Sequence, residues 1–136
     1  RKAAFGGEIR GMVHLLEALG GNDTALSLVR MGRVLLANFV ATARAFARRG
    51  RSAVDMRAYR NDMHRAVAYL TSEHTENTLT ADIVHMVCWM PVVLFTRPAM
   101  RTGVFAWTWL LSGRPDLAVL VLAELAAAWR WTIDNR

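Results

Sequence analysis

Apolar residues recur along most of the chain at intervals of three and four, which is the spacing of one face of an α-helix. The stretch 23–49 is the clearest case, because at about 100° per residue its apolar side chains fall within one stripe. This stripe consists of Leu28, Met31, Leu35, Phe39, Ala43 and Phe46. No stretch alternates apolar and polar residues as a half-buried strand does. The pattern therefore predicts an all-α fold.

Glycines and capping residues divide this pattern into six predicted helices, over about 8–19, 23–49, 53–72, 81–96, 98–112 and 115–134. Asn22 or Asp23 is expected to cap the second helix. Gly50 follows two arginines and is expected to end it. Ser52 with Asp55 resembles a capping box for the third.

The three prolines add to this division. Pro98 and Pro115 stand where a first helical turn accepts proline. Pro91 lies inside a predicted helix, where it removes a backbone donor and crowds the preceding turn. We expect Pro91 to kink or end that helix.

Short connections and continuous burial suggest how the helices pack. The brief turn at 50–51 favours an antiparallel hairpin. From Leu117 to Ala128 the last helix is apolar on every side except at Glu124, so neighbours must cover several of its faces. We expect Glu124 to be hydrogen-bonded, because an unpaired buried carboxylate is costly. The whole chain, 1–136, is predicted to be one α-solenoid segment of stacked antiparallel helix pairs.

Composition limits the class of protein. With 54% hydrophobic residues and a net charge of +6, the chain is not intrinsically disordered. Its single cysteine, Cys88, excludes an intrachain disulfide and any zinc site built from several cysteines. The longest runs without a charged residue, 83–96 and 102–113, are too short to span a membrane, and buried helices explain them better. Because the sequence starts without Met and stops within a helical pattern, we expect a fragment of a larger protein.

No pattern of catalytic or cofactor-binding residues is present. The chain lacks a phosphate-binding Gly-x-x-x-x-Gly-Lys loop, a Gly-x-Gly-x-x-Gly turn and a His-Glu-x-x-His helix. It also lacks the Asp-Phe-Gly and His-Arg-Asp signatures of kinases. No two of the four histidines have metal-ligand spacing. We therefore expect no catalytic residue, no cofactor and no metal in this chain.

Positive charge is concentrated between residues 30 and 65, a stretch that contains nine arginines and only two aspartates. On the helix 23–49, one set lies opposite the apolar stripe: Arg30, Arg33, Arg44 and Arg48. Such a face either contacts anionic lipid headgroups, nucleic acid or an acidic partner, or is a solvated helix surface, and we favour the solvated surface. We do not expect nucleic acid, because the nearby aromatic residues lie on apolar stripes and are not free to stack on bases. The alternative function for the chain is a free-standing basic helical module that binds anionic lipid or nucleic acid.

All five tryptophans lie in the last three predicted helices. Trp107 and Trp109 point about 200° apart on their helix, as do Trp129 and Trp131 on theirs. We expect these rings to be core residues of helices packed between layers.

Four short blocks of the chain combine residues in a specific way. Residues 6–13 contain Gly-Glu-x-x-Gly-Met, and residues 82–95 contain His-x-x-Cys-Trp-x-Pro. Residues 105–111 contain Trp-x-Trp-Leu-Leu, and residues 124–132 contain Glu-x-Ala-x-Ala-Trp-x-x-Thr. In this order the blocks resemble the type III alpha phosphatidylinositol 4-kinases, in the helical region before the kinase domain. The family-like positions are Gly7, Glu8, Gly11, Met12, Cys88, Trp89, Pro91, Trp107, Trp109, Glu124 and Trp129.

The resemblance implies that the chain is a helical scaffold fragment of a larger lipid kinase. Such a parent enzyme makes phosphatidylinositol 4-phosphate from phosphatidylinositol with ATP and Mg²⁺. It is cytoplasmic, is recruited to the plasma membrane, and works with tetratricopeptide-repeat and hyccin-type subunits. None of its catalytic motifs maps onto this stretch, and the matching residues look like helix-packing positions. Met90 and Trp131 depart from the family pattern, and the arginines between 24 and 52 do not resemble a family feature.

Overall fold

The computed structural model describes residues 21–72 and 79–136. These residues form five α-helices and two short 3-10 turns, without any strand. The helices are α2 (Gly21–Arg49), α3 (Met56–Thr71), α4 (Leu79–Leu94), α5 (Arg97–Gly113) and α6 (Ala118–Asn135), and the turns are η1 (Arg51–Ala53) and η2 (Pro115–Leu117). The all-α prediction is confirmed. The predicted helix 8–19 and the family-like positions Gly7, Glu8, Gly11 and Met12 lie outside the described residues.

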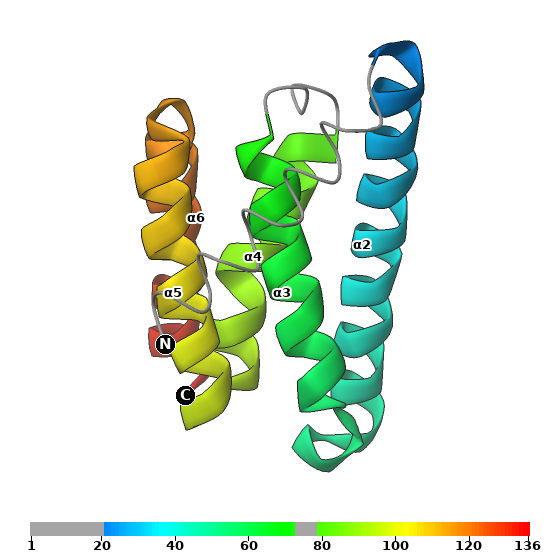
Figure 1. Ribbon diagram of the computed structural model, residues 1–136. Coiled ribbons are helices and arrows are strands. Elements are labelled where there is room, and N and C mark those ends of the chain that lie inside the picture. Colours follow the sequence, from blue (N-terminus) through cyan, green and yellow to red (C-terminus); the bar gives the residue numbers. More distant parts are fainter. Residues whose placement is uncertain (1–20, 73–78) are drawn as a thin grey trace.

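The helices alternate between two layers. Helices α2, α4 and α6 run in one direction, and α3 and α5 run in the other (Figure 1). Within the layers α4 packs between α2 and α6, and α3 packs against α5. Helix α4 also touches α3 and α5, so it lies at the centre of the bundle. This arrangement is compatible with a segment of an α-solenoid.

The connection between α2 and α3 differs from the predicted capping box. Residues 51–53 form the 3-10 turn, and α3 begins at Met56 instead of residue 53. Asp55 is itself the N-cap, because its carboxylate accepts hydrogen bonds from the backbone amides of Arg57 and Ala58, at 3.0 and 3.1 Å. The Ser52 prediction was wrong, because Asp55 caps the helix directly.

The ends of α2 agree only in part with the predicted ones. The helix already includes Gly21, so neither Asn22 nor Asp23 precedes it as a cap. At the other end the prediction is confirmed, since α2 ends at Arg49 and Gly50 follows with φ 81°. This positive φ favours glycine, which has no Cβ to crowd the backbone.

The core forms from the predicted apolar stripes. Leu28, Leu35 and Phe39 of α2 are fully buried, and the other three members of that stripe pack against the core. On α3, Tyr59 is fully buried and its hydroxyl donates to the carbonyl of Ala99 on α5, at 2.9 Å. Burial raises the pKa of Tyr59 far above its usual range. Its hydroxyl therefore remains protonated and links the two helices.

A partly buried hydrogen bond joins α2 to α3. The side-chain amide of Asn38 donates to the buried carboxylate of Asp62, at 3.1 Å. Burial raises the pKa of Asp62, and the Asn38 bond and the charge of Arg65 oppose that shift. The pair satisfies polar groups that would otherwise oppose burial.

Pro91 neither ends α4 nor lies at its terminus. The helix continues three residues further, to Leu94, and Phe95 then turns the chain with φ 50°. The proline ring is buried against Gly103 of α5. A Cβ built on Gly103 would lie 2.6 Å from both Cβ and Cγ of Pro91. The missing side chain at Gly103 therefore sets how closely α4 and α5 approach.

We expect Gly103→Ala to lower the free energy of unfolding by about 1–3 kcal/mol, because the added methyl group overlaps the Pro91 ring. A loss of stability would be informative, because a glycine-to-alanine change at an unhindered helix position raises the free energy of unfolding by up to about 1 kcal/mol. Urea denaturation of the two proteins gives the difference. Ser112→Ala, at an exposed position of the same helix, should change stability by less than about 0.5 kcal/mol. A more stable Gly103→Ala variant would show that the contact is loose.

Candidate functional site

Five of the family-like residues gather where α4, α5 and α6 meet: Cys88, Trp89, Pro91, Trp107 and Glu124. Trp107 of α5 makes the most informative contact, because its indole N–H donates to the backbone carbonyl of Val87, at 3.0 Å. Val87 is four residues before Pro91, which has no N–H to offer that carbonyl. The ring of Trp107 thus replaces the hydrogen bond that proline removes from α4.

Glu124 joins α6 to α4. Its Oε2 accepts a hydrogen bond from the indole N–H of Trp89, at 2.7 Å, and lies 2.8 Å from Nδ1 of His85. The rings of His85 and Trp89 also lie against each other, with centroids 5.3 Å apart, and Trp131 meets Trp89 edge-on at 6.2 Å. The expectation that Glu124 is hydrogen-bonded is confirmed. The carboxylate orients both rings between the two helices.

Cys88 lies in the same interface and is fully buried. Its thiol donates weakly to the carbonyl of Val121, with sulfur and oxygen 3.8 Å apart. Burial, and to a smaller extent the charge of Glu124, raises the pKa of Cys88 to about 12. The thiol is therefore a packing group without nucleophilic character at neutral pH.

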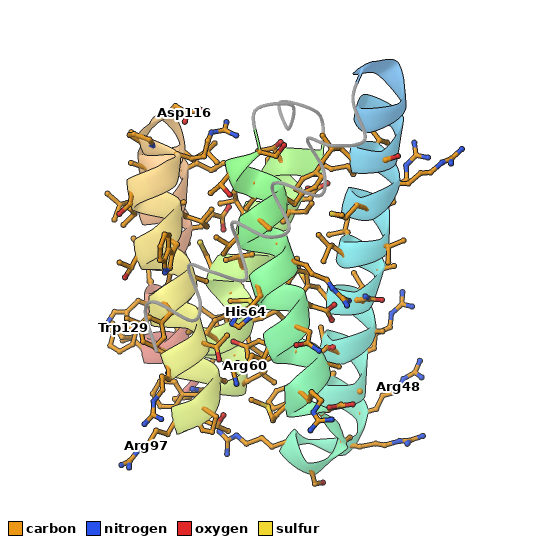
Figure 2. The ribbon with its side chains drawn as sticks, viewed as in Figure 1. Arg48, Arg60, His64, Arg97, Asp116 and Trp129 are labelled. Atoms are coloured by element: carbon orange, nitrogen blue, oxygen red, sulfur yellow. The ribbon has the colours of Figure 1, made fainter. Side chains whose placement is uncertain are left out.

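The outer face of α6 contradicts the expectation that neighbours cover it on several sides. The helix buries Val121, Ala128 and Thr132 against its neighbours. About 120° around the helix from these residues, an apolar row with heptad-like spacing is exposed: Val119, Leu122, Ala126, Trp129 and Ile133. Trp129, which we expected in the core, is 55% exposed and lies at the edge of the bundle (Figure 2). Trp109 is partly buried against the core, as expected. We call this row the α6 stripe.

The predicted arginine face is present on α2. Arg30, Arg33, Arg44 and Arg48 are all exposed, and Arg48 points away from the bundle (Figure 2). None of the four forms an ion pair with an acidic residue in the described part of the chain. The two pairs are separated by eleven residues, or about 16 Å along the helix. Phe39 and Tyr59 are buried, so these aromatic rings cannot stack on bases.

Other arginines have a structural role that the sequence did not indicate. They donate to carbonyls at the C-terminal ends of helices, where a cation also opposes the helix dipole. The bonds run from Arg51 to Leu94, from Arg136 to Val93 and from Arg114 to Leu70, at 2.9, 2.8 and 2.8 Å. Part of the positive charge of the chain therefore stabilises α3 and α4.

The described residues, 21–72 and 79–136, contain neither a candidate metal site nor a candidate membrane-spanning helix. No group of three or more His, Cys, Asp or Glu side chains there could hold a metal ion. None of the helices described is both long enough and apolar enough to cross a membrane.

Comparison with known proteins identifies the family. The family model for the PI4-kinase N-terminal region matches residues 24–136. The chain belongs to this family. Phosphatidylinositol 4-kinase alpha 1 from Arabidopsis thaliana is 30% identical to it, in an alignment that covers 99% of the chain and 8% of that relative. No solved structure matches the chain.

Membership confirms the resemblance to phosphatidylinositol 4-kinases. The chain spans about one-twelfth of the length of the curated relative. Within it the structure brings together Cys88, Trp89, Pro91, Trp107 and Glu124, and it leaves Trp129 outside that cluster. The cluster consists of packing contacts between α4, α5 and α6.

Replacing Trp107 tests the link to Pro91. We expect Trp107→Phe to lower the free energy of unfolding by about 1–3 kcal/mol, because the carbonyl of Val87 loses its donor. Pro91→Ala restores a backbone N–H at position 91, which can bond that carbonyl within α4. The double variant should therefore be more stable than the sum of the single changes predicts, by about 1 kcal/mol or more. If denaturation experiments show that the stability losses of the two single variants simply add in the double variant, the indole N–H of Trp107 does not take the place of the backbone N–H that Pro91 lacks.

The environment of Cys88 predicts its reactivity. Because its pKa is raised to about 12, the thiol of the folded chain should not react with Ellman's reagent near pH 8, and it should react fully once urea unfolds the chain. The absorbance change on mixing measures both states. Rapid labelling without denaturant would indicate that the α4–α6 interface opens.

Proposed function

We propose that the chain is a non-catalytic helical segment of a phosphatidylinositol 4-kinase, whose role is to pack against further helices of the same polypeptide. Family membership supports the identity of the parent as a phosphatidylinositol 4-kinase. One structural observation supports the packing role. The α6 stripe exposes five apolar residues on a side of α6 that the other described helices leave uncovered. Apolar rows of this size normally mark an interface.

The spacing of the α6 stripe favours another helix as its partner. Its members recur at intervals of three and four over about 21 Å, which is the pattern that an antiparallel or parallel helix packs against. The curated relative is far longer than this chain, so a parent of that size has further segments to supply such a helix. A further helix packed on α6 would continue the pattern in which successive helices, from α2 onwards, lie in alternate layers.

The proposed parent is a lipid kinase that transfers the γ-phosphate of ATP, with Mg²⁺, to phosphatidylinositol. The name of the Arabidopsis relative supports this activity. We further propose that the parent is cytoplasmic, acts at the plasma membrane, and assembles with tetratricopeptide-repeat and hyccin-type subunits, as the resemblance of the sequence implies. The ATP and Mg²⁺ sites belong to a kinase domain elsewhere in the parent.

A matched pair of substitutions in the full-length parent tests this role. Ala126 belongs to the α6 stripe, whereas its neighbour Ala127 is exposed outside it. In the 136-residue chain, Ala126→Asp and Ala127→Asp should each cost under about 1 kcal/mol, since both side chains reach water. In the parent, only Ala126→Asp buries an unpaired carboxylate, and it should lower the thermal midpoint and the yield of soluble kinase.

The measurements are thermal unfolding and phosphatidylinositol 4-kinase activity of the purified parent. Equal tolerance of both variants in the parent would mean that no helix covers the α6 stripe. Absence of lipid kinase activity from the unsubstituted parent would refute the enzyme assignment separately. The two failures are thus distinguishable.

A further inference from the structure

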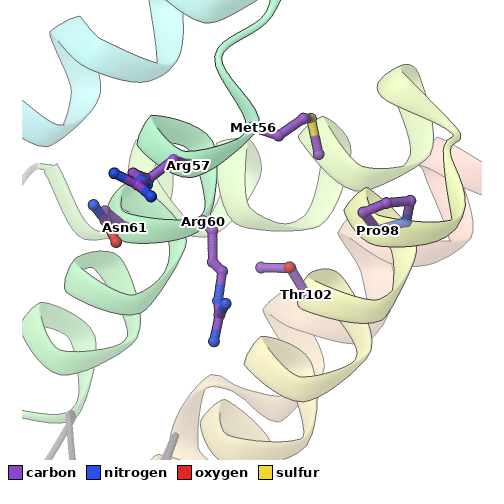
Figure 3. A pocket seen from close by; sticks show the side chains of 6 residues that line it. All are labelled: Met56, Arg57, Arg60, Asn61, Pro98 and Thr102. Atoms are coloured by element: carbon purple, nitrogen blue, oxygen red, sulfur yellow. The ribbon is translucent and has the colours of Figure 1, made fainter.

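A cavity of about 500 Å³ opens between the first turns of α3 and α5, some forty residues apart in the sequence (Figure 3). It is lined by Met56, Arg57, Arg60, Asn61, Pro98 and Thr102. It shares no residue with the arginine face of α2 or with the α6 stripe. We call it the α3–α5 pocket.

Positive charge in the α3–α5 pocket is not neutralised by nearby carboxylates. No acidic side chain lines it. Arg57 and Arg60 form no ion pair with any residue in the described ranges. The carboxylate of Asp55 accepts from two backbone amides, and Asp62 bonds Asn38 and lies near Arg65. Both guanidinium groups therefore have donors available for another anion.

The direction of the helices adds to this charge. Because α4 lies between them in the chain, α3 and α5 run parallel and both begin at the end where the pocket lies (Figure 1). The N-terminal end of a helix carries a partial positive charge, which the Asp55 carboxylate offsets at α3 but the neutral cap Thr96 leaves in place at α5. Arg97 and Arg101, both exposed, also lie on the first turns of α5. The surroundings of the pocket therefore carry four arginines, Arg57, Arg60, Arg97 and Arg101, against the one carboxylate of Asp55.

The pocket has a polar and a less polar part. Arg60 extends between the two helices beside Thr102, whereas Arg57 and Asn61 lie together on the side of α3 away from Thr102 (Figure 3). All four side chains line the pocket. Met56 and Pro98 stand at one end (Figure 3). Guanidinium groups donate in pairs to phosphate oxygens, and hydroxyl and amide groups complete such sites.

We infer that the α3–α5 pocket binds a phosphate group, held by Arg60 and Thr102 between the helices with Arg57 and Asn61 at the rim, on a ligand whose less polar part contacts Met56 and Pro98. The phosphate belongs either to a soluble phosphate ester or to a phospholipid headgroup. This site is independent of the proposed function, since it requires neither a kinase domain nor a covered α6 stripe.

Nuclear magnetic resonance of the complete 136-residue chain tests the inference. Inorganic phosphate is titrated at constant ionic strength, with chloride as the balancing anion. We expect the amide signals of Arg57, Arg60, Asn61 and Thr102 to shift together along one saturating curve. In Arg57→Gln/Arg60→Gln the apparent dissociation constant should rise about tenfold or more, as the loss of charge-assisted bonds requires.

Two further variants separate a built site from general positive charge. Arg44→Gln/Arg48→Gln removes the same charge from exposed positions of α2, and it should leave the phosphate curve unchanged. Thr102→Val keeps every charge and should weaken binding about threefold or more through the lost hydroxyl. Circular dichroism confirms that each variant retains the helix content of the parent chain.

Flotation with vesicles identifies the source of the phosphate. Phosphatidylcholine vesicles with and without one-fifth phosphatidic acid are mixed with each variant. If the chain floats with the acidic vesicles and Arg57→Gln/Arg60→Gln does not, the phosphate belongs to a lipid headgroup. If the chain binds inorganic phosphate but does not float with these vesicles, the phosphate belongs to a soluble ester. Equal weakening by the two double variants, or phosphate shifts spread over all exposed arginines, would overturn the inference, as would no shift at all.

Discussion

The carbonyl of Val87 is the group on which the arrangement of α4 and α5 depends. Pro91 leaves this carbonyl without its partner inside α4, in the most enclosed helix of the bundle. A buried carbonyl without a donor is costly, so a neighbour has to supply one. Trp107 does so, at 3.0 Å, and Gly103 one turn earlier lets α5 approach closely enough. Register, distance and orientation of the two helices thus follow from one backbone group.

Other polar side chains also join pairs of helices. Glu124 satisfies the indole of Trp89 and contacts His85, which fixes α6 on the far side of α4. Tyr59 reaches the carbonyl of Ala99 and ties the second layer together. Dispersed apolar burial supplies most of the stability, and these few bonds select one packing among many.

Much of the fold could be predicted from the sequence, because helical periodicity, glycine stops and prolines are local signals. The apolar stripe of α2, its end at Gly50 and the bonded state of Glu124 were all predicted. Local signals do not say which partner meets which face. The donor for Val87 comes from twenty residues away, and Asp55 could replace Ser52 as the cap because either side chain can accept from an exposed amide.

The remaining differences also concern tertiary contacts. An all-round apolar helix predicts burial, but the neighbour that buries it need not belong to the described residues, and for this reason Trp129 was placed in the core and lies outside it. The α3–α5 pocket combines side chains of two helices that are separated by all of α4, so its members do not stand out in the sequence. Arg57 and Arg60 were seen only as part of a general excess of charge.

The exposed row on α6 also has a consequence for how such a protein is made. A helical array grows by adding each new helix to the one before it, so every intermediate on the ribosome ends in an uncovered apolar face. When synthesis has reached α6, the helices before it can already bury their core, and the unfinished edge is the row from Val119 to Ile133. If the proposed role holds, that edge is where a nascent chain of this kind is most exposed to misassembly.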